Sequence, residues 1–211
     1  MPRVAWKDFA WQVSAMSTDG NGALRIEAQN LKALRRLDWS PSGVCALVGP
    51  NGSGKSTTLR IIDVLRQSLE NGFGGGLQGL GAGPLRHLDA PNTEPVRIQV
   101  NLRTAKWQLA IAGMNKVREV AEDDGLVLQR GASGASVTVA SKANNQFMGL
   151  PAEADEPMLR AVLRPENGQG PLRELAAMLA RSRFYGGSQL EHLRDAGSAL
   201  PWRNPRRSPQ R

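Results

Sequence analysis

Cysteine is almost missing from this chain, which carries Cys45 alone among its 211 residues. A single thiol cannot form a disulfide within the chain, so the sequence is not that of a disulfide-stabilised secreted scaffold. Cys45 lies in the short apolar run 44–48. We therefore expect it to be a small buried residue of a protein that folds in a reducing compartment.

Long apolar segments are also missing. No part of the sequence approaches the about 20 apolar residues that a membrane-spanning helix needs. The first 16 residues mix Arg3, Lys7 and Asp8 with scattered apolar residues, whereas a signal peptide has a continuous apolar centre. These absences predict a cytoplasmic protein without a membrane segment.

Aromatic residues make up only 5% of the chain, but hydrophobic residues reach 40% and charged residues 22%, which is enough for a packed core. The length suits one domain, or one domain with a small insertion. Lys and Arg total 27 against 19 Asp and Glu, so the net charge is +8. This excess would suit a polyanionic partner such as nucleic acid, although arginines dispersed over a solvated surface give the same total.

The most specific pattern in the chain is G-x-x-x-x-G-K-[ST], which begins at Gly49. The apolar run 44–48 before it is typical of a buried strand, and residues 58–69 after it have the apolar spacing of a helix. A strand, a glycine-rich turn and a helix in this order are the setting of a phosphate-binding loop. The alternative interpretation is an ordinary glycine-rich turn before a helix.

Each residue type in this loop has a physical purpose. Glycines let the backbone curl so that successive N–H groups surround an anion, and the following helix adds its positive N-terminal end. We expect Lys55 to contact the β- and γ-phosphates of ATP and Ser56 to bind Mg²⁺. The predicted nucleotide-binding residues are Gly49, Pro50, Asn51, Gly52, Ser53, Gly54, Lys55, Ser56 and Thr57, with Ser56 as the metal ligand.

Composition divides the rest of the chain into segments. Glycine dominates residues 72–84, so this stretch is predicted to be a loop rather than a helix or a strand. The predicted segments are an N-terminal extension (1–22), an incomplete P-loop ATPase domain (23–200) and a basic tail (201–211); within the domain lie a glycine-rich loop (67–94), an antiparallel β arm (95–140) and a helical part (142–200).

Alternation of apolar and polar residues predicts the strands of the arm. Val96, Ile98 and Val100 alternate with polar residues, as in a sheet with one solvated face. Strands without helices between them pair antiparallel. The predicted strands are 24–28, 44–48, 95–102, 105–112, 125–129 and 131–140, and the predicted helices are 58–69, 156–163 and a longer one that begins at Gly170-Pro171 and ends at Gly186-Gly187.

The phosphate loop, together with Leu31-Lys32-Ala33-Leu34 and the strand 44–48 before it, resembles the N-terminal lobe of ABC-like ATPases of the AAA family. The closest resemblance is to the branch related to RecF, SMC and the OLD-type nucleases, and it covers roughly residues 23–195 as an order of elements. It implies an α/β fold: a P-loop NTPase lobe with a partly parallel core sheet, an antiparallel β arm and a helical C-terminal stretch. It also implies an ATPase that closes around a partner such as DNA or an associated nuclease.

The resemblance assigns further roles residue by residue. Leu31 occupies the position at which the family has an aromatic residue, and Lys32 matches its basic neighbour. Gln146 is the candidate for the glutamine that contacts Mg²⁺ and water in the family. The Ser-Gly-rich signature is not found in its usual form, although Gly186-Gly187-Ser188-Gln189 has a similar composition. His87 and His192 lack the context of a switch histidine and are predicted to be surface residues.

The acidic residue that hydrolysis requires is also not found. An aspartate at the end of an apolar strand normally holds Mg²⁺ in this class of enzyme. No aspartate after the loop follows four apolar residues; these aspartates are Asp63, Asp89, Asp123, Asp124, Asp155 and Asp195. The sequence therefore resembles the front half of an ATPase, as in a truncated or split protein.

Two hypotheses remain. In the first, the chain is an ATP-binding lobe that hydrolyses ATP as a homodimer or with a complementary ATPase half. In the second, it is a non-catalytic fragment or regulatory subunit that docks on another chain. A third interpretation, a small-molecule kinase, is less favoured because the sequence shows neither the short spacing to a lid nor an arginine cluster facing the loop.

Overall fold

The computed structural model describes residues 24–81, 84–113, 116–130, 136–142, 147–151, 155–163 and 170–183. The predicted extension 1–22, the tail 201–211 and Gln146 lie outside these residues. The described strands are β1 (Leu24–Leu31), β2 (Leu34–Trp39), β3 (Val96–Leu102), β4 (Ala105–Gly113), β5 (Lys116–Glu122), β6 (Leu126–Arg130), β7 (Ser136–Ser141) and β8 (Phe147–Pro151), and the described helices are α1 (Lys55–Gln78), α2 (Met158–Val162) and α3 (Pro171–Arg181).

The strands form one sheet in the order β2-β1-β3-β4-β5-β6-β7-β8, and neighbouring strands pair antiparallel throughout. The α/β class and the antiparallel arm are confirmed, although the prediction omits β2, β5 and β8. The partly parallel core sheet is wrong for the described residues, since no parallel pair occurs among them. A parallel pair needs a long crossover connection, whereas most of these strands follow one another directly along the chain.

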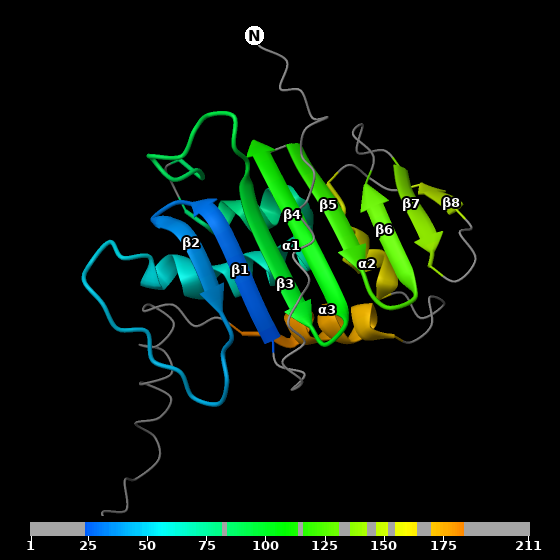
Figure 1. Cartoon of the computed structure of the whole chain (residues 1–211), viewed down its shortest axis with the longest axis horizontal. Helices are drawn as coiled ribbons and strands as arrows, with labels where there is room; N and C mark the ends of the chain where they lie inside the picture. Colours follow the sequence, from blue (N-terminus) through cyan, green and yellow to red (C-terminus); the bar gives the residue numbers. More distant parts are fainter. Residues whose placement is uncertain are drawn as a thin grey trace, which may run out of the picture.

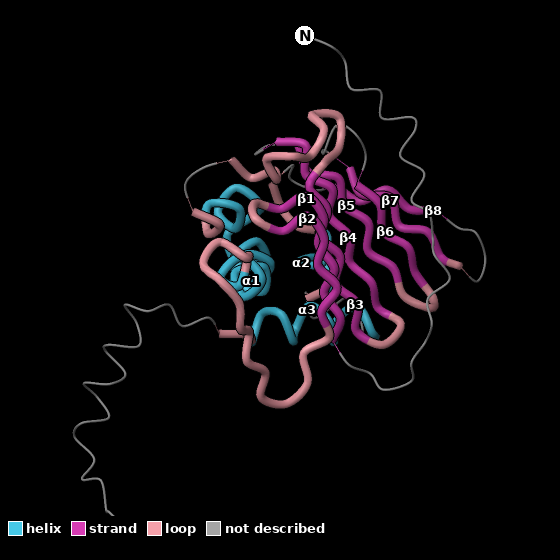
Figure 2. The backbone as a smooth tube through the Cα atoms, turned by 60° about the vertical axis from the view of Figure 1, so that its left-hand side comes forward, coloured by secondary structure: helices cyan, strands magenta, loops and turns pink. Residues whose placement is uncertain are grey.

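All three helices lie on one face of this sheet, as Figures 1 and 2 show from two sides. The core fills the space between the two layers. Alternate residues of the strands point into it, including Ile98, Val100 and Trp107. Residues spaced three or four apart on the helices meet them, such as Ile61 and Leu65 of α1.

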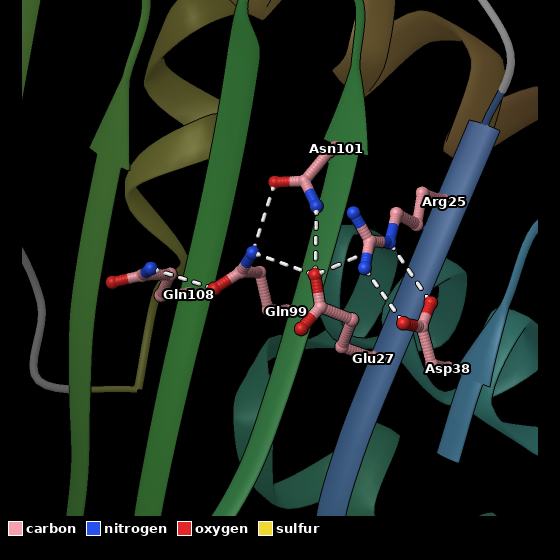
Figure 3. Close-up of polar contacts among 6 residues, drawn as sticks. All are labelled: Arg25, Glu27, Asp38, Gln99, Asn101 and Gln108. Atoms are coloured by element: carbon pink, nitrogen blue, oxygen red, sulfur yellow. Dashed lines mark hydrogen bonds and ion pairs between the residues drawn. The ribbon is translucent and has the colours of Figure 1, made fainter. Parts of the chain in front are cut away.

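The opposite face of the sheet carries a ladder of polar side chains (Figure 3). Gln108 Nε2 donates to Gln99 Oε1 at 2.7 Å, and Gln99 Nε2 donates to Glu27 Oε1 at 3.2 Å. At the edge, Arg25 makes two hydrogen bonds to Asp38, of 2.8 and 2.6 Å, which lower the pKa of that carboxyl group. The predicted alternation of an apolar and a polar face is therefore confirmed for β3.

The strand predicted at 44–48 is not formed. Residues 44–50 have no regular secondary structure, and the side chains of Val44 and Val48 are 104% and 94% exposed. Cys45, predicted to be buried, is exposed, and its Sγ donates to the Ser42 carbonyl oxygen at 3.1 Å. A strand needs a neighbour to satisfy its backbone, and no described strand runs beside this segment.

Part of the predicted glycine-rich loop is helical. Helix α1 breaks at Gly72, where φ is 81° and ψ is 171°, and then resumes to Gln78. The buried side chains of Phe73 and Leu77 anchor this second segment. A Cβ on Gly76 would lie 2.7 Å from the Val64 carbonyl oxygen, so the second segment folds back onto the first where only glycine allows such a close approach. The prediction of a loop over 67–94 is therefore wrong for 67–78.

The C-terminal helices lie close to their predicted positions. The short helix expected at 156–163 is α2, and α3 begins at Pro171, a favoured first residue of a helix. Helix α3 ends at Arg181 rather than at the predicted Gly186-Gly187, which lies outside the described residues. Ser182 is the C-cap: its ψ of 147° leaves the helical range, and its N–H donates to the Leu179 carbonyl oxygen at 3.1 Å.

No helix in the described ranges is long and apolar enough to cross a membrane.

Candidate functional site

The predicted phosphate loop leads directly into α1, whose first residue is Lys55. Gly54 caps the helix with φ 91° and ψ 3°, and Gly52 has φ 81°. Both lie in the left-handed region that favours glycine. The junction of loop and helix is therefore confirmed, whereas the strand expected before it is not. The loop itself is exposed from Gly49 to Ser53, so its residues are accessible.

Gly54 also holds the loop against the turn between β1 and β2. A Cβ at this position would lie 2.3 Å from Leu34 Cδ2 and 3.9 Å from the Ala33 carbonyl carbon. A side chain there would have to displace Leu34, and the φ of 91° also favours glycine. The base of the phosphate loop is consequently fixed by packing to the edge of the sheet.

Lys55 is wrapped by its own loop. Its Nζ donates to the carbonyl oxygens of Gly49 at 2.7 Å and Pro50 at 2.6 Å, and Ser53 Oγ lies 3.5 Å away. The ammonium group thus lies inside the curve of the loop, surrounded by neutral oxygens. A phosphate that enters the loop would exchange these contacts for a charged partner, which makes stronger hydrogen bonds.

The start of α1 offers free backbone donors beside this lysine. The first N–H groups of a helix have no partner within the helix and carry a partial positive charge. No acidic side chain in the first turn of α1 competes for them. The Gly54 carbonyl oxygen accepts from the N–H and the hydroxyl of Thr58, at 2.8 and 3.1 Å. Ser56 is exposed, as a metal ligand has to be.

No group of three or more His, Cys, Asp or Glu side chains that could hold a metal occurs among the described residues. Asp63, the first aspartate after the loop, is buried in α1, where Arg66 binds it at 2.9 Å and Gln67 at 2.6 Å. It is therefore a structural residue of the helix. His192 and Asp195 lie outside the described ranges.

A pocket of about 520 Å³ opens beside the β1–β2 turn, against which Gly54 packs. Lys32 and Ala33 of the β1–β2 turn form one side, and the chain after α1 forms the other. Leu31, which holds the family's aromatic position, is fully buried and lies in the core instead. The lining residues are Lys32, Ala33, Pro84, Arg86, His87, Leu88 and Asp89.

The sequence did not reveal this pocket. His87 stands alone in the sequence and was predicted to be a surface residue, yet it is half-buried and lines the pocket together with Lys32. Leu31 and Arg86 form an isolated antiparallel bridge, which brings the two walls together over a long separation in sequence. This bridge places the two walls side by side. Because it consists of a single residue pair, the sequence shows no apolar periodicity that would predict it.

Comparison with known proteins gives one family match. Residues 44–98 match the model of a family described as "AAA domain, putative AbiEii toxin, Type IV TA system". The matched segment contains the phosphate loop and α1 and ends in β3. It supports a P-loop NTPase-type AAA domain, a class that generally binds ATP with Mg²⁺. No curated protein and no solved structure gives a significant match to this chain.

Proposed function

We propose that the chain is the nucleotide-binding lobe of a P-loop ATPase of the AAA type, and that it belongs to the ABC-like branch related to RecF and the OLD-type nucleases. It binds ATP with Mg²⁺ through residues 49–57. The observation that carries the proposal is the exposed loop at the start of α1, with Lys55 Nζ held inside its curve at 2.6 to 2.7 Å from two loop carbonyls.

The residues of the loop have separate roles. Lys55 neutralises the β- and γ-phosphates, and the backbone N–H groups of Gly52 and Gly54 bind the β-phosphate. The Ser56 hydroxyl binds Mg²⁺. Hydrolysis also needs an acidic residue near the metal, and Asp63, the first aspartate after the loop, is instead held by Arg66 and Gln67. We therefore propose that hydrolysis requires a complementary ATPase half or a second copy of the chain.

Isothermal titration of the purified chain with Mg·ATP tests the proposal. We expect Lys55→Ala to weaken ATP binding at least about tenfold, which corresponds to 1.4 kcal/mol, because it removes the only cation inside the loop among the described residues. Arg35→Ala is the matched control, since it removes one positive charge from an exposed position on β2. Unchanged affinity of the Lys55→Ala variant for ATP would contradict the assignment.

The second hypothesis, a non-catalytic subunit that docks on another chain, is favoured by one observation. The apolar run 44–48 is exposed at Val44 and Val48 and lacks a neighbouring strand among the described residues. Apolar segments of this kind pair with a strand of a partner. Measuring ATP hydrolysis by the chain alone and with a candidate complementary half separates the two hypotheses. If the chain is only a docking subunit, its phosphate loop does not contribute to hydrolysis by the complex. Lys55→Ala would then leave the ATPase activity of the complex unchanged.

A further inference from the structure

The pocket beside the β1–β2 turn has a defined backbone frame. Lys32 N–H donates to the Leu85 carbonyl oxygen at 2.9 Å, and His87 N–H donates to the Asn30 carbonyl oxygen at 2.9 Å. These bonds lie on either side of the bridge between Leu31 and Arg86. The chain after α1 is thus paired with the end of β1, and both walls of the pocket are fixed.

The pocket and the phosphate loop share one wall. Ala33 lines the pocket, and the same residue lies behind Gly54, 3.9 Å from where a Cβ on that glycine would be. Whatever occupies the pocket is therefore next to the start of α1. A ligand whose phosphates lie in the loop has the pocket as its adjacent cavity.

The pocket has the chemistry of a site for a flat ring with polar edges. Ala33, Pro84 and Leu88 supply apolar surface, and Leu88 is accessible, with 86% of it exposed. Lys32 and Asp89 add a donor and an acceptor of hydrogen bonds. Apolar walls with a few placed polar groups are typical of sites for small organic ligands.

The ring of His87 is already oriented. Its Nδ1 accepts a hydrogen bond from the Asp89 backbone N–H at 3.2 Å. Because that nitrogen acts as an acceptor, the proton of the neutral imidazole lies on Nε2. His87 therefore presents a fixed aromatic face for stacking and one N–H donor.

Arg86 is a structural part of the pocket wall. Its Nη1 donates to the Asn92 carbonyl oxygen at 2.7 Å, and its Nε is buried without a hydrogen-bond partner within the described residues. Because a solvent-inaccessible nitrogen cannot contact a ligand in an open pocket, Arg86 supports the wall rather than the ligand.

We propose that this pocket binds the base and ribose of the nucleotide whose phosphates lie in the loop 49–54, with His87 stacking on the base. The inference rests on the proposed ATP-binding function and adds its base-recognition site. The aromatic contact that Leu31 cannot make from the core is supplied by His87, from the opposite wall of the pocket.

Comparing Mg·ATP with magnesium tripolyphosphate, which has the phosphates but no nucleoside, tests the proposal by isothermal titration. We expect the unmodified chain to bind ATP at least tenfold more tightly than tripolyphosphate. His87→Ala should weaken ATP about tenfold and leave tripolyphosphate unchanged. Leu88→Ala is a second variant, and because this side chain is 86% exposed its removal does not affect folding. It should weaken ATP several-fold and again spare tripolyphosphate.

Lys55→Ala is the control that separates the two proposals, since it should weaken both ligands. Equal affinity of the unmodified chain for ATP and tripolyphosphate would overturn the base site while leaving the phosphate loop in place. The same conclusion would follow if His87→Ala and Leu88→Ala left ATP binding unchanged. Absence of binding of either ligand would overturn the ATP-binding function together with the base site.

Discussion

Gly54 is the residue at which the phosphate loop meets the sheet, and this contact can be isolated by substitution. Gly54→Ala places a Cβ 2.3 Å from Leu34 Cδ2 in a backbone with φ 91°. We expect a loss of about 2–5 kcal/mol in the free energy of unfolding, the sum of left-handed strain and overpacking. Urea denaturation measures it.

Gly52→Ala is the matched control for this loss. Gly52 has φ 81° but nothing within 4 Å of the added Cβ. The Gly52→Ala substitution should therefore lower the free energy of unfolding only by the backbone strain, about 1–2 kcal/mol. If the two variants were equally stable, the packing of Gly54 against Leu34 would not exist in solution.

Glu119 is a fully buried carboxylate in the core between the sheet and α2. Trp107 Nε1 and the Met158 N–H donate to its Oε1, both at 2.8 Å, and Arg130 Nε donates to its Oε2 at 3.2 Å. Burial raises the pKa of Glu119 to about 7, against the opposing effects of Arg130 and the other donors. Its ionised form is therefore disfavoured in the folded chain compared with the unfolded one.

This pKa predicts how stability depends on pH. Between pH 4.5, the ordinary value, and about 7 the folded chain binds more protons at Glu119 than the unfolded chain does. The contribution of this group to the free energy of unfolding is present below the ordinary pKa and is lost as the pH rises to about 7. Denaturation at a series of pH values should show this decline, and Glu119→Gln should remove it.

Near pH 7, Glu119→Gln should also lower stability by about 3–5 kcal/mol, because it removes the carboxylate that pairs with the buried charge of Arg130. The double variant Glu119→Leu with Arg130→Met removes both charges and should recover most of that loss. A pH profile of Glu119→Gln as steep as that of the unmodified chain would show that another group titrates in this range.

At the scale of elements, α1 depends on a residue far along the chain. Beyond its break at Gly72, the Phe73 N–H donates to the Asp155 carbonyl oxygen at 2.9 Å and the Gly74 N–H to Asp155 Oδ1 at 2.8 Å. Asp155 therefore caps the second helical segment from outside it. We expect Asp155→Ala to cost about 1 kcal/mol of stability in urea denaturation, the usual value of such a cap.

Asp155→Asn is the control, since its amide oxygen can still accept the Gly74 N–H. It should lose much less stability than Asp155→Ala. An equal loss in both variants would mean that the charge of Asp155, rather than the hydrogen bond, stabilises the segment.

The elements that the sequence predicted are those whose signal is local. The alternation over 95–102 and the Gly-Pro start of α3 each depend on neighbouring residues, and both agree with the structure. Strand β5 was missed because the buried pair with Arg130 puts Glu119 on its core face, where alternation requires an apolar residue. The helical part of the glycine run depends on the distant Asp155, which no local pattern shows.

At the scale of the whole molecule, the segment before the phosphate loop is the main departure from expectation. The sequence correctly predicted a glycine-rich junction and a helix, because both depend on residues within the loop itself. It did not predict the exposure of Val44 and Val48, because an apolar run signals a buried strand only when another strand lies beside it. The pocket at Arg86 and His87 likewise depends on tertiary contacts.

The exposure of this segment predicts tolerance to charge. Val44→Asp with Val48→Asp should change the free energy of unfolding of the isolated chain by no more than about 0.5 kcal/mol per site, since neither side chain is buried. Val64→Asp, at a buried position on α1, is the control and should prevent folding. Guanidinium denaturation distinguishes them. A loss above about 2 kcal/mol in the double variant would show that 44–48 is packed in solution.

The order of the strands also bears on how the chain acquires its structure. From β3 to β8, each strand pairs with the one that follows it in the chain, so the partners are brought together by closing short turns. Topologies dominated by such near-neighbour pairings fold fast. The segment that holds the phosphate loop connects β2 to β3 and is much longer than these turns. Closing it costs more chain entropy, so we expect it to close later. Strands β3–β8 can thus pair before β1 and β2 join them, and substitutions in the loop should leave the rate of that pairing unaltered.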